Sequence, residues 1–286
     1  MRVITELTFG SLQTGWQGIN EFLFTESKKI EAKGGGAYGP EWISYDNYVM
    51  MRKAWVDPEF NFGKKLGYTK KKWGALVNNY IDFRYLDMVK AEITHRVMKK
   101  ARSYNYSYHF DNAHGSGKDC LISINFTKRV SHEHPILVFN IRTSEVTKRL
   151  LFDFLLVQRI GEYVYGHNDF EVHFFAPSFY ITAESMCMYN NIVPLHELVP
   201  EPTHSFQEKV FKRLDHFLTI EDPETITYRV HRRVAKQVRR DENGEPESGT
   251  VDMFAKDLIL APRHTKDYPE DVVSKSQRKK YDRDRK

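Results

Sequence analysis

The hydrophobic pattern between residues 83 and 166 changes period twice, and this constrains the fold more than any other feature of the chain. Apolar residues recur at helical spacing over 83–101, and alternation with polar residues follows over 102–110 and 120–127. After the strand-like segment 136–144, a mostly apolar helical pattern covers 145–166. This order predicts an α+β fold, with helices packed on a mixed, mostly antiparallel sheet.

The apolar residues on one side of each expected helix identify the expected core. A helix over 11–27 would bury Trp16, Ile19, Phe22 and Leu23, and the helix over 83–101 would bury Leu86, Val89, Ile93 and Val97. In the helix over 145–166 the core candidates are Leu151, Phe154, Leu155 and Ile160. One or two strands over 169–184, broken at Pro177, follow, and late strands are expected over 219–228 and 250–260.

Composition excludes several classes of protein. The 286 residues carry 41% hydrophobic and 28% charged side chains, as expected for a globular protein. No apolar run reaches the length of a bilayer span, and the N-terminal residues show no signal-peptide core. Two cysteines cannot form a disulfide framework, and their spacing to histidines does not suggest a metal site. We therefore expect a cytoplasmic protein without a membrane segment or a bound metal.

Cys120 opens the strand over 120–127. If this strand and the strand over 136–144 form a hairpin centred near Ser131, Cys120 lies opposite Arg142. In this register Ile122 faces Asn140, Ile124 faces Val138 and Phe126 faces Ile136.

The pairing of Cys120 with Arg142 has two interpretations. A guanidinium next to a cysteine stabilises the thiolate, which is the nucleophilic form, and arginine also binds phosphate well. In the alternative interpretation Cys120 is a small buried residue and Arg142 belongs to a surface ion pair. Cys187, in the apolar stretch "SMCMY", is expected in the core.

The segments around Cys120 resemble the core of the thymidylate synthase superfamily, which includes deoxynucleotide hydroxymethylases. The resemblance covers roughly residues 11 to 184: a helix leads to Arg102, a cysteine then opens a strand, and the return strand ends in "FNIRTSEV". Arg142 matches the phosphate-binding arginine of the family, Thr143 its serine and Glu145 its aspartate. In "NDFEVHFFAPSFY", Tyr180 falls on the tyrosine that holds the deoxyribose.

The chain departs from the family pattern near the cysteine. Asp119 and Leu121 flank Cys120 where the family has proline and histidine. The helix after Arg142 is shorter than in the family, so the base-reading position depends on where the gap lies. A late gap places Asp153 there, as in cytosine-specific hydroxymethylases, whereas an early gap places Lys148 there.

The resemblance implies a reaction. The Cys120 thiolate would add to C6 of a pyrimidine deoxynucleotide 5′-monophosphate, and C5 would then take a one-carbon unit from 5,10-methylenetetrahydrofolate, as methyl or hydroxymethyl. Arg142 and Thr143 would hold the phosphate, helped by Arg102 from the second subunit of a homodimer that packs sheet to sheet. Tyr180 would hold the sugar.

Two other hypotheses remain open: the same fold acting on DNA or a modified base, and a non-catalytic binding protein. The basic segment 229–240 and the basic end of the chain motivate a nucleic-acid contact, although such runs are also typical of solvated surfaces. We expect one domain over residues 1–265 and a basic, flexible tail over 266–286.

Overall fold

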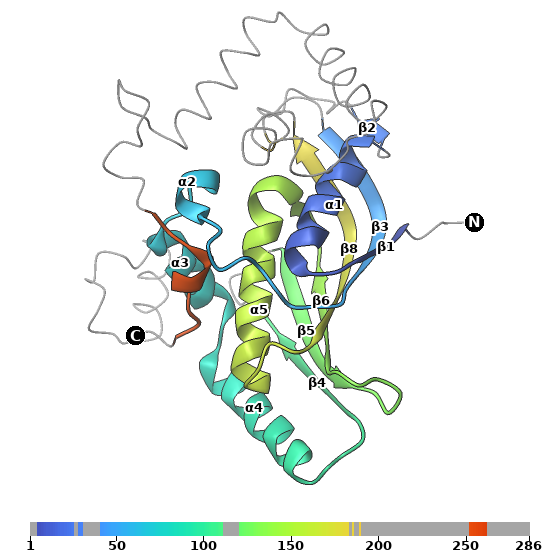
Figure 1. Ribbon diagram of the computed structural model, residues 1–286, viewed down its shortest axis with the longest axis vertical. Helices are drawn as coiled ribbons and strands as arrows, with labels where there is room; N and C mark the ends of the chain where they lie inside the picture. Colours follow the sequence, from blue (N-terminus) through green and yellow to red (C-terminus); the bar gives the residue numbers. More distant parts are fainter. Residues whose placement is uncertain are drawn as a thin grey trace, which may run out of the picture.

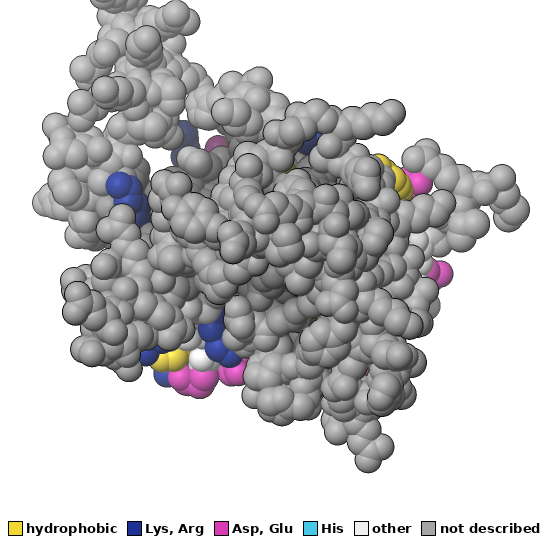
Figure 2. Space-filling model, turned by 90° about the horizontal axis from the view of Figure 1, so that it is seen from above, with side chains coloured by type: hydrophobic (Ala, Val, Ile, Leu, Met, Phe, Trp, Pro, Cys, Tyr) yellow, Lys and Arg dark blue, Asp and Glu magenta, His cyan; other side chains and the backbone are white. Residues whose placement is uncertain are grey.

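The computed structural model describes residues 5–25, 28–30, 41–110, 120–182, 185, 189 and 252–261. Within these ranges no helix is both long and apolar enough to cross a bilayer. Helices α1, α4 and α5 lie in front of the strands in Figure 1, and the segment 252–261, in red, lies beside α2 and α3. Described side chains of both charge signs lie next to one another in the view from above in Figure 2.

The elements follow the chain in two groups. The first half contains β1 (Thr5–Phe9), α1 (Leu12–Thr25), β2 (Lys28–Ile30), β3 (Glu41–Met51), α2 (Phe62–Leu66), α3 (Lys70–Tyr80), α4 (Phe83–Met98) and β4 (Tyr104–His109). The second half contains β5 (Leu121–Lys128), β6 (Ile136–Ile141), β7 (Ser144–Glu145), the π-helix η1 (Val146–Leu150), α5 (Leu151–Tyr165), β8 (Glu171–Thr182) and the 3₁₀-helix η2 (Ala255–Asp257).

The described strands form one mixed sheet of eight strands. Its main order is β1-β3-β8-β6-β5-β4, with β2 paired to β3 and β7 paired to β8. The pairs β2–β3, β3–β8, β4–β5 and β5–β6 are antiparallel, whereas β1–β3, β6–β8 and β7–β8 are parallel. The predicted α+β class with helices on a mixed sheet is therefore confirmed.

One face of the sheet is covered by α1, α4 and α5, and the main core lies there (Figure 1). The predicted stripes are confirmed for Trp16, Ile19 and Leu23 in α1 and for Leu86, Val89 and Ile93 in α4. The four core candidates in α5 are fully buried. The prediction for Val97 is wrong: its side chain is 58% exposed, because α4 ends one residue later, beyond the core.

The β5–β6 hairpin confirms the expected pairing at its open end. The backbone N–H of Arg142 donates to the carbonyl of Cys120 at 2.8 Å, and Leu121 pairs with Ile141. Deeper in the hairpin the predicted register is wrong by one residue, since Ser123 pairs with Asn140 and Phe126 pairs with Leu137.

A β-bulge at Ile122 explains both results. The turn is centred between residues 131 and 132 instead of on Ser131, so the pairs next to the turn are shifted by one residue. The bulge inserts one extra residue in β5, so the pairs at the open end of the hairpin return to the predicted register. The bulge also changes faces: Leu121 joins Ile124 in the core, whereas Ile122 is 42% exposed. Strict alternation along residues 120–127 predicts one face for Cys120, Ile122 and Ile124, and the bulge makes this prediction wrong for Ile122.

The predicted helix over 145–166 is present but begins as a π-helix. Glu145 caps it, its Oε2 accepting from the backbone N–H of Lys148 at 2.8 Å. Trp16 of α1 fixes this turn from the core side, because its indole N–H donates to the carbonyl of Val146 at 2.9 Å. The helix ends at Gly166, whose φ of 77° is the left-handed conformation that glycine adopts without strain.

Strand β8 runs through Pro177, so the predicted break there is wrong. Asp46 of β3, in the left-handed region at φ 53°, stands opposite Pro177, and pairing continues on both sides of this point. The missing N–H of proline thus falls in a local irregularity of the ladder. The strand expected over 250–260 is also wrong: residues 252–261 contain an isolated bridge from Phe254 to Asn61 and the short η2 helix.

Several expectations lie outside the described residues. These are the core position of Cys187, the strand over 219–228, the basic segment 229–240 and the tail over 266–286. The expected domain boundary after residue 265 also lies there.

Candidate functional site

A cavity of about 460 Å³ opens where the mouth of the β5–β6 hairpin meets α3 and the start of α5. We call it the Cys120 cavity. Its walls come from four parts of the chain: Leu66, Tyr68, Lys72, Ala75, Leu76, Asn79 and Tyr80; Cys120 and Leu121; Ser144, Glu145, Lys148, Arg149, Phe152 and Asp153; and Tyr180.

Cys120 directly precedes β5, at the open end of the β5–β6 hairpin, and lines this cavity as a half-buried residue. Its carbonyl is held by the backbone of Arg142, and the bulge at Ile122 breaks the regular alternation immediately after it. The side chain is therefore placed by an irregularity of the strand, which is a common device beside functional sites.

The side chains of Arg142 and Thr143 do not line the Cys120 cavity. Arg142 is exposed at the end of β6, and its backbone N–H is the group that bonds to the carbonyl of Cys120. The Thr143 hydroxyl accepts a hydrogen bond from Ser178 at 2.9 Å. The two residues expected to hold phosphate thus directly precede Ser144, which lines the cavity, but their own side chains do not line it.

Arg149 supplies the guanidinium within the cavity. Its pKa is raised above the ordinary arginine value although burial lowers it, because negative charge on Tyr180, Tyr68, Cys120 and Asp153 favours its charged form. The same attraction favours a thiolate on Cys120. Arg149, whose side chain is exposed, is therefore the arginine that lines the same cavity as Cys120, whereas Arg142 does not.

Two buried carboxyl groups face the cavity from the start of the helix. Burial raises the pKa of Asp153 to about 7, with the charge of Arg149 acting in the opposite direction. Burial also raises the pKa of Glu145, while the amide of Lys148 stabilises its ionised form. Near neutral pH Asp153 therefore exchanges between acid and carboxylate, so it can donate as well as accept a hydrogen bond.

Asp153 and Lys148, the two alternatives for the base-reading position, both line the cavity. They differ in environment: Asp153 is 9% exposed, whereas Lys148 is half-buried. A buried group with both donor and acceptor capacity suits the recognition of a base edge.

Aromatic rings form another part of the cavity wall. Tyr68 stacks on Phe152 with ring centres 4.1 Å apart, and its hydroxyl donates to the carbonyl of Lys148. Lys72 covers the Tyr68 ring at 5.0 Å and donates to the carbonyl of Gly67 at 3.0 Å. Tyr180 of β8 is half-buried and stands beside Glu145, its partner in the β7–β8 pairing.

Arg102 lies elsewhere in the same chain. It lines a surface hollow of about 570 Å³ with Lys100, Lys128 and Val130, at the end of α4. The structure does not bring Arg102 to Cys120 within one chain.

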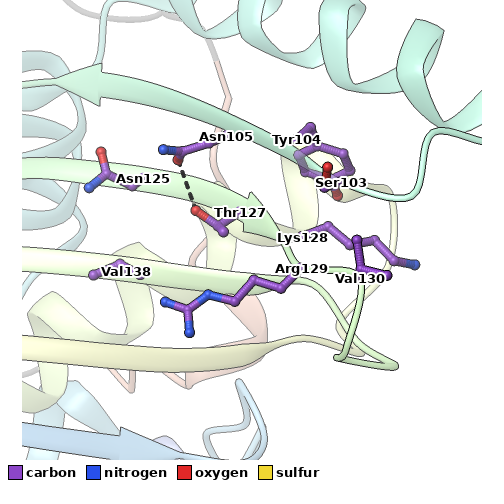
Figure 3. Close-up of a pocket in the computed structure, with 9 residues that line it drawn as sticks. All are labelled: Ser103, Tyr104, Asn105, Asn125, Thr127, Lys128, Arg129, Val130 and Val138. Carbon is purple, nitrogen blue, oxygen red and sulfur yellow. Dashed lines mark hydrogen bonds between the residues drawn. The ribbon is translucent and has the colours of Figure 1, made fainter.

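A third hollow, of about 630 Å³, lies on the face of the sheet that the described helices leave uncovered, which we call the open face. Figure 3 shows Asn105, Asn125 and Thr127 side by side across β4 and β5, with the Thr127 hydroxyl donating to Asn105 at 2.9 Å. Arg129 extends along the sheet and Lys128 points away from it (Figure 3). We call this site the Asn125 hollow.

Sequence reasoning missed Lys72, Arg149 and Tyr68. Arg149 was visible as part of "TKRLL", two cations directly before a buried run, but a regular helix does not predict that both of them line the cavity. Lys72 follows Thr69, which caps α3 by accepting from the Lys72 backbone N–H at 3.3 Å, and the α2–α3 pair was not predicted.

Comparisons with known proteins give little. No family model and no curated protein matches the sequence. Among solved structures, the chain is similar to thermostable thymidylate synthase A from Bacillus subtilis, with 10% identity over 63% of this chain and 84% of that one, and a TM-score of 0.39. A likeness at this level does not establish a shared function, and the geometry of the Cys120 cavity stands independently of it.

Proposed function

We propose that the protein transfers a one-carbon unit to C5 of a pyrimidine deoxynucleotide 5′-monophosphate through a covalent adduct on Cys120. The observation that carries this proposal is the convergence of Cys120, Arg149, Asp153 and Tyr180 on one cavity. A thiol beside a guanidinium supplies a nucleophile, and a buried carboxyl supplies a group that reads a base.

Cytosine is the base that Asp153 favours. A carboxylic acid that donates to the ring nitrogen N3 and accepts from the exocyclic amine matches the cytosine edge, and a pKa of about 7 keeps the acid form populated near neutral pH. Uracil presents an N–H and a carbonyl at these positions, which an asparagine matches better than an aspartate.

The role of Cys120 is to make C5 nucleophilic. When its thiolate adds to C6, the S–C6 bond forms, the C5–C6 double bond opens, and the electron pair moves toward C5 and the conjugated N3. After C5 has gained its new carbon substituent, C5 loses its proton and the S–C6 bond breaks, which restores the double bond and the thiolate. Arg149 favours the thiolate form of Cys120 both before it adds to C6 and after it is released.

The lining of the cavity supports the expected one-carbon donor. Leu66, Leu76 and Tyr80 add apolar and aromatic surface from the α2–α3 side, against which a flat pteridine ring of 5,10-methylenetetrahydrofolate would be held. When bound, this cofactor would supply a carbon at the oxidation level of formaldehyde. Water would complete a hydroxymethyl product, whereas a methyl product would need a hydride, which the tetrahydrofolate can supply as it is oxidised to dihydrofolate.

The proposal includes a homodimer that packs open face against open face. The apolar side chains Tyr45 and Phe175 reach this face and remain exposed in the single chain. Such packing would leave the Cys120 cavity, at the strand ends, accessible, and Arg102 of each subunit would be free to approach the nucleotide of the other.

Release of tritium from C5 tests the proposal. Purified protein is incubated with 5-tritiated dCMP or dUMP, with and without methylenetetrahydrofolate, and tritium in water is counted. We expect cofactor-dependent release from dCMP, greater than from dUMP. Absence of release from both nucleotides would count against the reaction, and greater release from dUMP would refute the assignment of cytosine to Asp153.

A further inference from the structure

Three cations reach the Cys120 cavity from two sides. Lys72 comes from the first turn of α3, whereas Lys148 and Arg149 come from the π-helix η1 that precedes α5. The π-helix matters here, because a wider turn changes which side chains of "VTKRL" face the cavity. The three cations belong to elements far apart in sequence that the fold brings to one hollow.

These cations are close enough to repel one another. The pKa of Lys72 is lowered by burial first, and then by the positive charges of Arg149 and Lys148. Like charges held together at a cavity raise the free energy of the empty site, and an anion bound between them lowers it.

The carboxyl groups that line the cavity offset this charge only in part. Asp153 and Glu145 are both buried, and burial raises the pKa of Asp153 to about 7, so near neutral pH Asp153 carries less than a full charge and the two carboxyl groups together carry less than two. Three cations therefore face fewer than two negative charges among the residues that line the cavity.

We propose that Lys72, Lys148 and Arg149 form the seat for the phosphate of the nucleotide, in place of Arg142 and Thr143. This inference rests on the proposed function, since it takes the Cys120 cavity as the nucleotide site. A phosphate has three terminal oxygens and nearly two negative charges, which suits three donors approaching from two walls. A carboxylate has two oxygens and one charge, which matches three cations less well.

The positions of Arg142 and Thr143 support the same assignment. The side chains of both lie outside the lining of the cavity. A phosphate held by these two side chains would not lie among the residues that line the cavity with Cys120.

Calorimetric titration with deoxycytidine and with dCMP tests the seat without requiring any reaction. The affinity ratio of dCMP to deoxycytidine measures what the phosphate contributes. Because a charged hydrogen-bonded contact contributes roughly a ten- to hundred-fold change in affinity, we expect this ratio to fall by about that factor in Arg149→Gln and in Lys72→Gln. Lys71→Gln, on the same helix but outside the cavity lining, is the matched control and should keep the ratio, as should Arg142→Gln.

The outcomes separate this inference from the proposed function. If the ratio falls in Arg142→Gln and stays unchanged in Arg149→Gln, the phosphate lies at Arg142 and the inference is wrong. Equal affinity of the wild-type protein for dCMP and deoxycytidine, or no binding of either, would also overturn it. A phosphate-dependent ratio that Arg149→Gln abolishes, in a protein that releases no tritium from C5, would retain the seat and reject the reaction.

One further arm distinguishes the nucleotide from the cofactor. Tetrahydrofolate carries carboxylates on its glutamate tail, so its affinity is titrated for the same variants. If Arg149→Gln and Lys72→Gln weaken tetrahydrofolate and leave the dCMP ratio unchanged, the cations hold the tail and the phosphate seat is refuted.

Discussion

The Cys120 cavity and the Asn125 hollow are both polar depressions at the sheet, yet their chemistry differs. The cavity holds two buried carboxyl groups, a thiol and three cations. The Asn125 hollow is lined by amides and hydroxyls, with Thr127 bonded to Asn105, and its cations Lys128 and Arg129 lie on an open surface. Burial and neighbouring charges both shift the pKa of a titratable group. Both act on the groups that line the Cys120 cavity.

A buried polar side chain, His173, also belongs to the open face. It lies between Tyr48, whose hydroxyl is 2.7 Å from Nδ1, and Glu171, whose Oε2 is 3.2 Å from Nε2. Burial lowers the pKa of His173 despite the charge of Glu171. Both ring nitrogens are thus in contact with neighbours on the sheet itself, which indicates a structural role. These differences support the proposal of chemistry in the cavity and of a protein contact on the open face.

The largest expected effect concerns the thiol. Cys120→Ser should lower turnover by roughly a thousand-fold or more, because a hydroxyl is a far weaker nucleophile at neutral pH. Asn125→Ala, in the open-face hollow, should leave the turnover near that of the wild type. Steady-state tritium release measures both, and a Cys120→Ser protein that retains wild-type turnover would break the assignment of chemistry to the cavity.

Two neighbouring phenylalanines in β8 allow the contributions of the two sheet faces to the free energy of unfolding to be compared. Phe174 is fully buried and stacks on Phe139 with ring centres 5.2 Å apart, whereas Phe175 is 37% exposed on the open face. Phe174→Ala should lower the free energy of unfolding by about 3–5 kcal/mol, and Phe175→Ala by about 1 kcal/mol or less. Urea denaturation measures both values. Equal losses would show that the open face is packed as tightly as the core.

The pH dependence of stability reports on Asp153. Its pKa rises from 3.8 to about 7 on folding, so the folded protein binds more protons than the unfolded chain between these values. Stability should therefore fall as the pH rises from 4 to 7 and level off above, with a contribution of roughly 2–3 kcal/mol between pH 5 and pH 8.

Asp153→Asn should remove this contribution, so the variant gains stability relative to the wild type as the pH rises. Urea denaturation at pH 5 and pH 8 checks the sign. A gain that is equal at pH 5 and pH 8 would mean that Asp153 is ionised in the folded state throughout this range.

The smallest effect on the single chain is expected at the proposed dimer surface. Phe175→Glu places a charge at an exposed position, so it should change the protomer stability little, but it should dissociate a dimer formed through the open face. Sedimentation velocity of the wild type and the variant measures this. A wild-type monomer, or a dimer unchanged by the substitution, would contradict the open-face contact.

Local patterns predicted more of the fold than of the site. The stripes of α1, α4 and α5 could be read because each has a strong helical period and a large apolar face. The strands β1 and β3 were not predicted; β3 reads "EWISYDNYVMM", whose alternation is interrupted by Asp46, the residue with positive φ.

The site depended on irregularities that a period cannot encode. The pairing of Cys120 with Arg142 at the open end of the hairpin was predicted for a regular hairpin. It is observed because the shift of the turn by half a residue is compensated by the extra residue of the bulge at Ile122. Arg149 could not be chosen over Arg142 as the guanidinium of the cavity, since its direction depends on the π-helix η1. The contribution of Lys72 depends on contact between α3 and η1, which is set by tertiary packing.

The central claim is that Cys120 is the nucleophile of the cavity, and trapping its adduct tests this most directly. A fluorine at C5 cannot leave as a proton does, so the covalent complex should persist. Protein incubated with methylenetetrahydrofolate and 5-fluoro-dCMP or 5-fluoro-dUMP is analysed by intact mass and by peptide mapping. We predict an adduct with 5-fluoro-dCMP on the peptide that contains Cys120, and none in Cys120→Ser. Absence of an adduct with both fluorinated nucleotides in the wild-type protein, or an adduct on another residue, would contradict the claim.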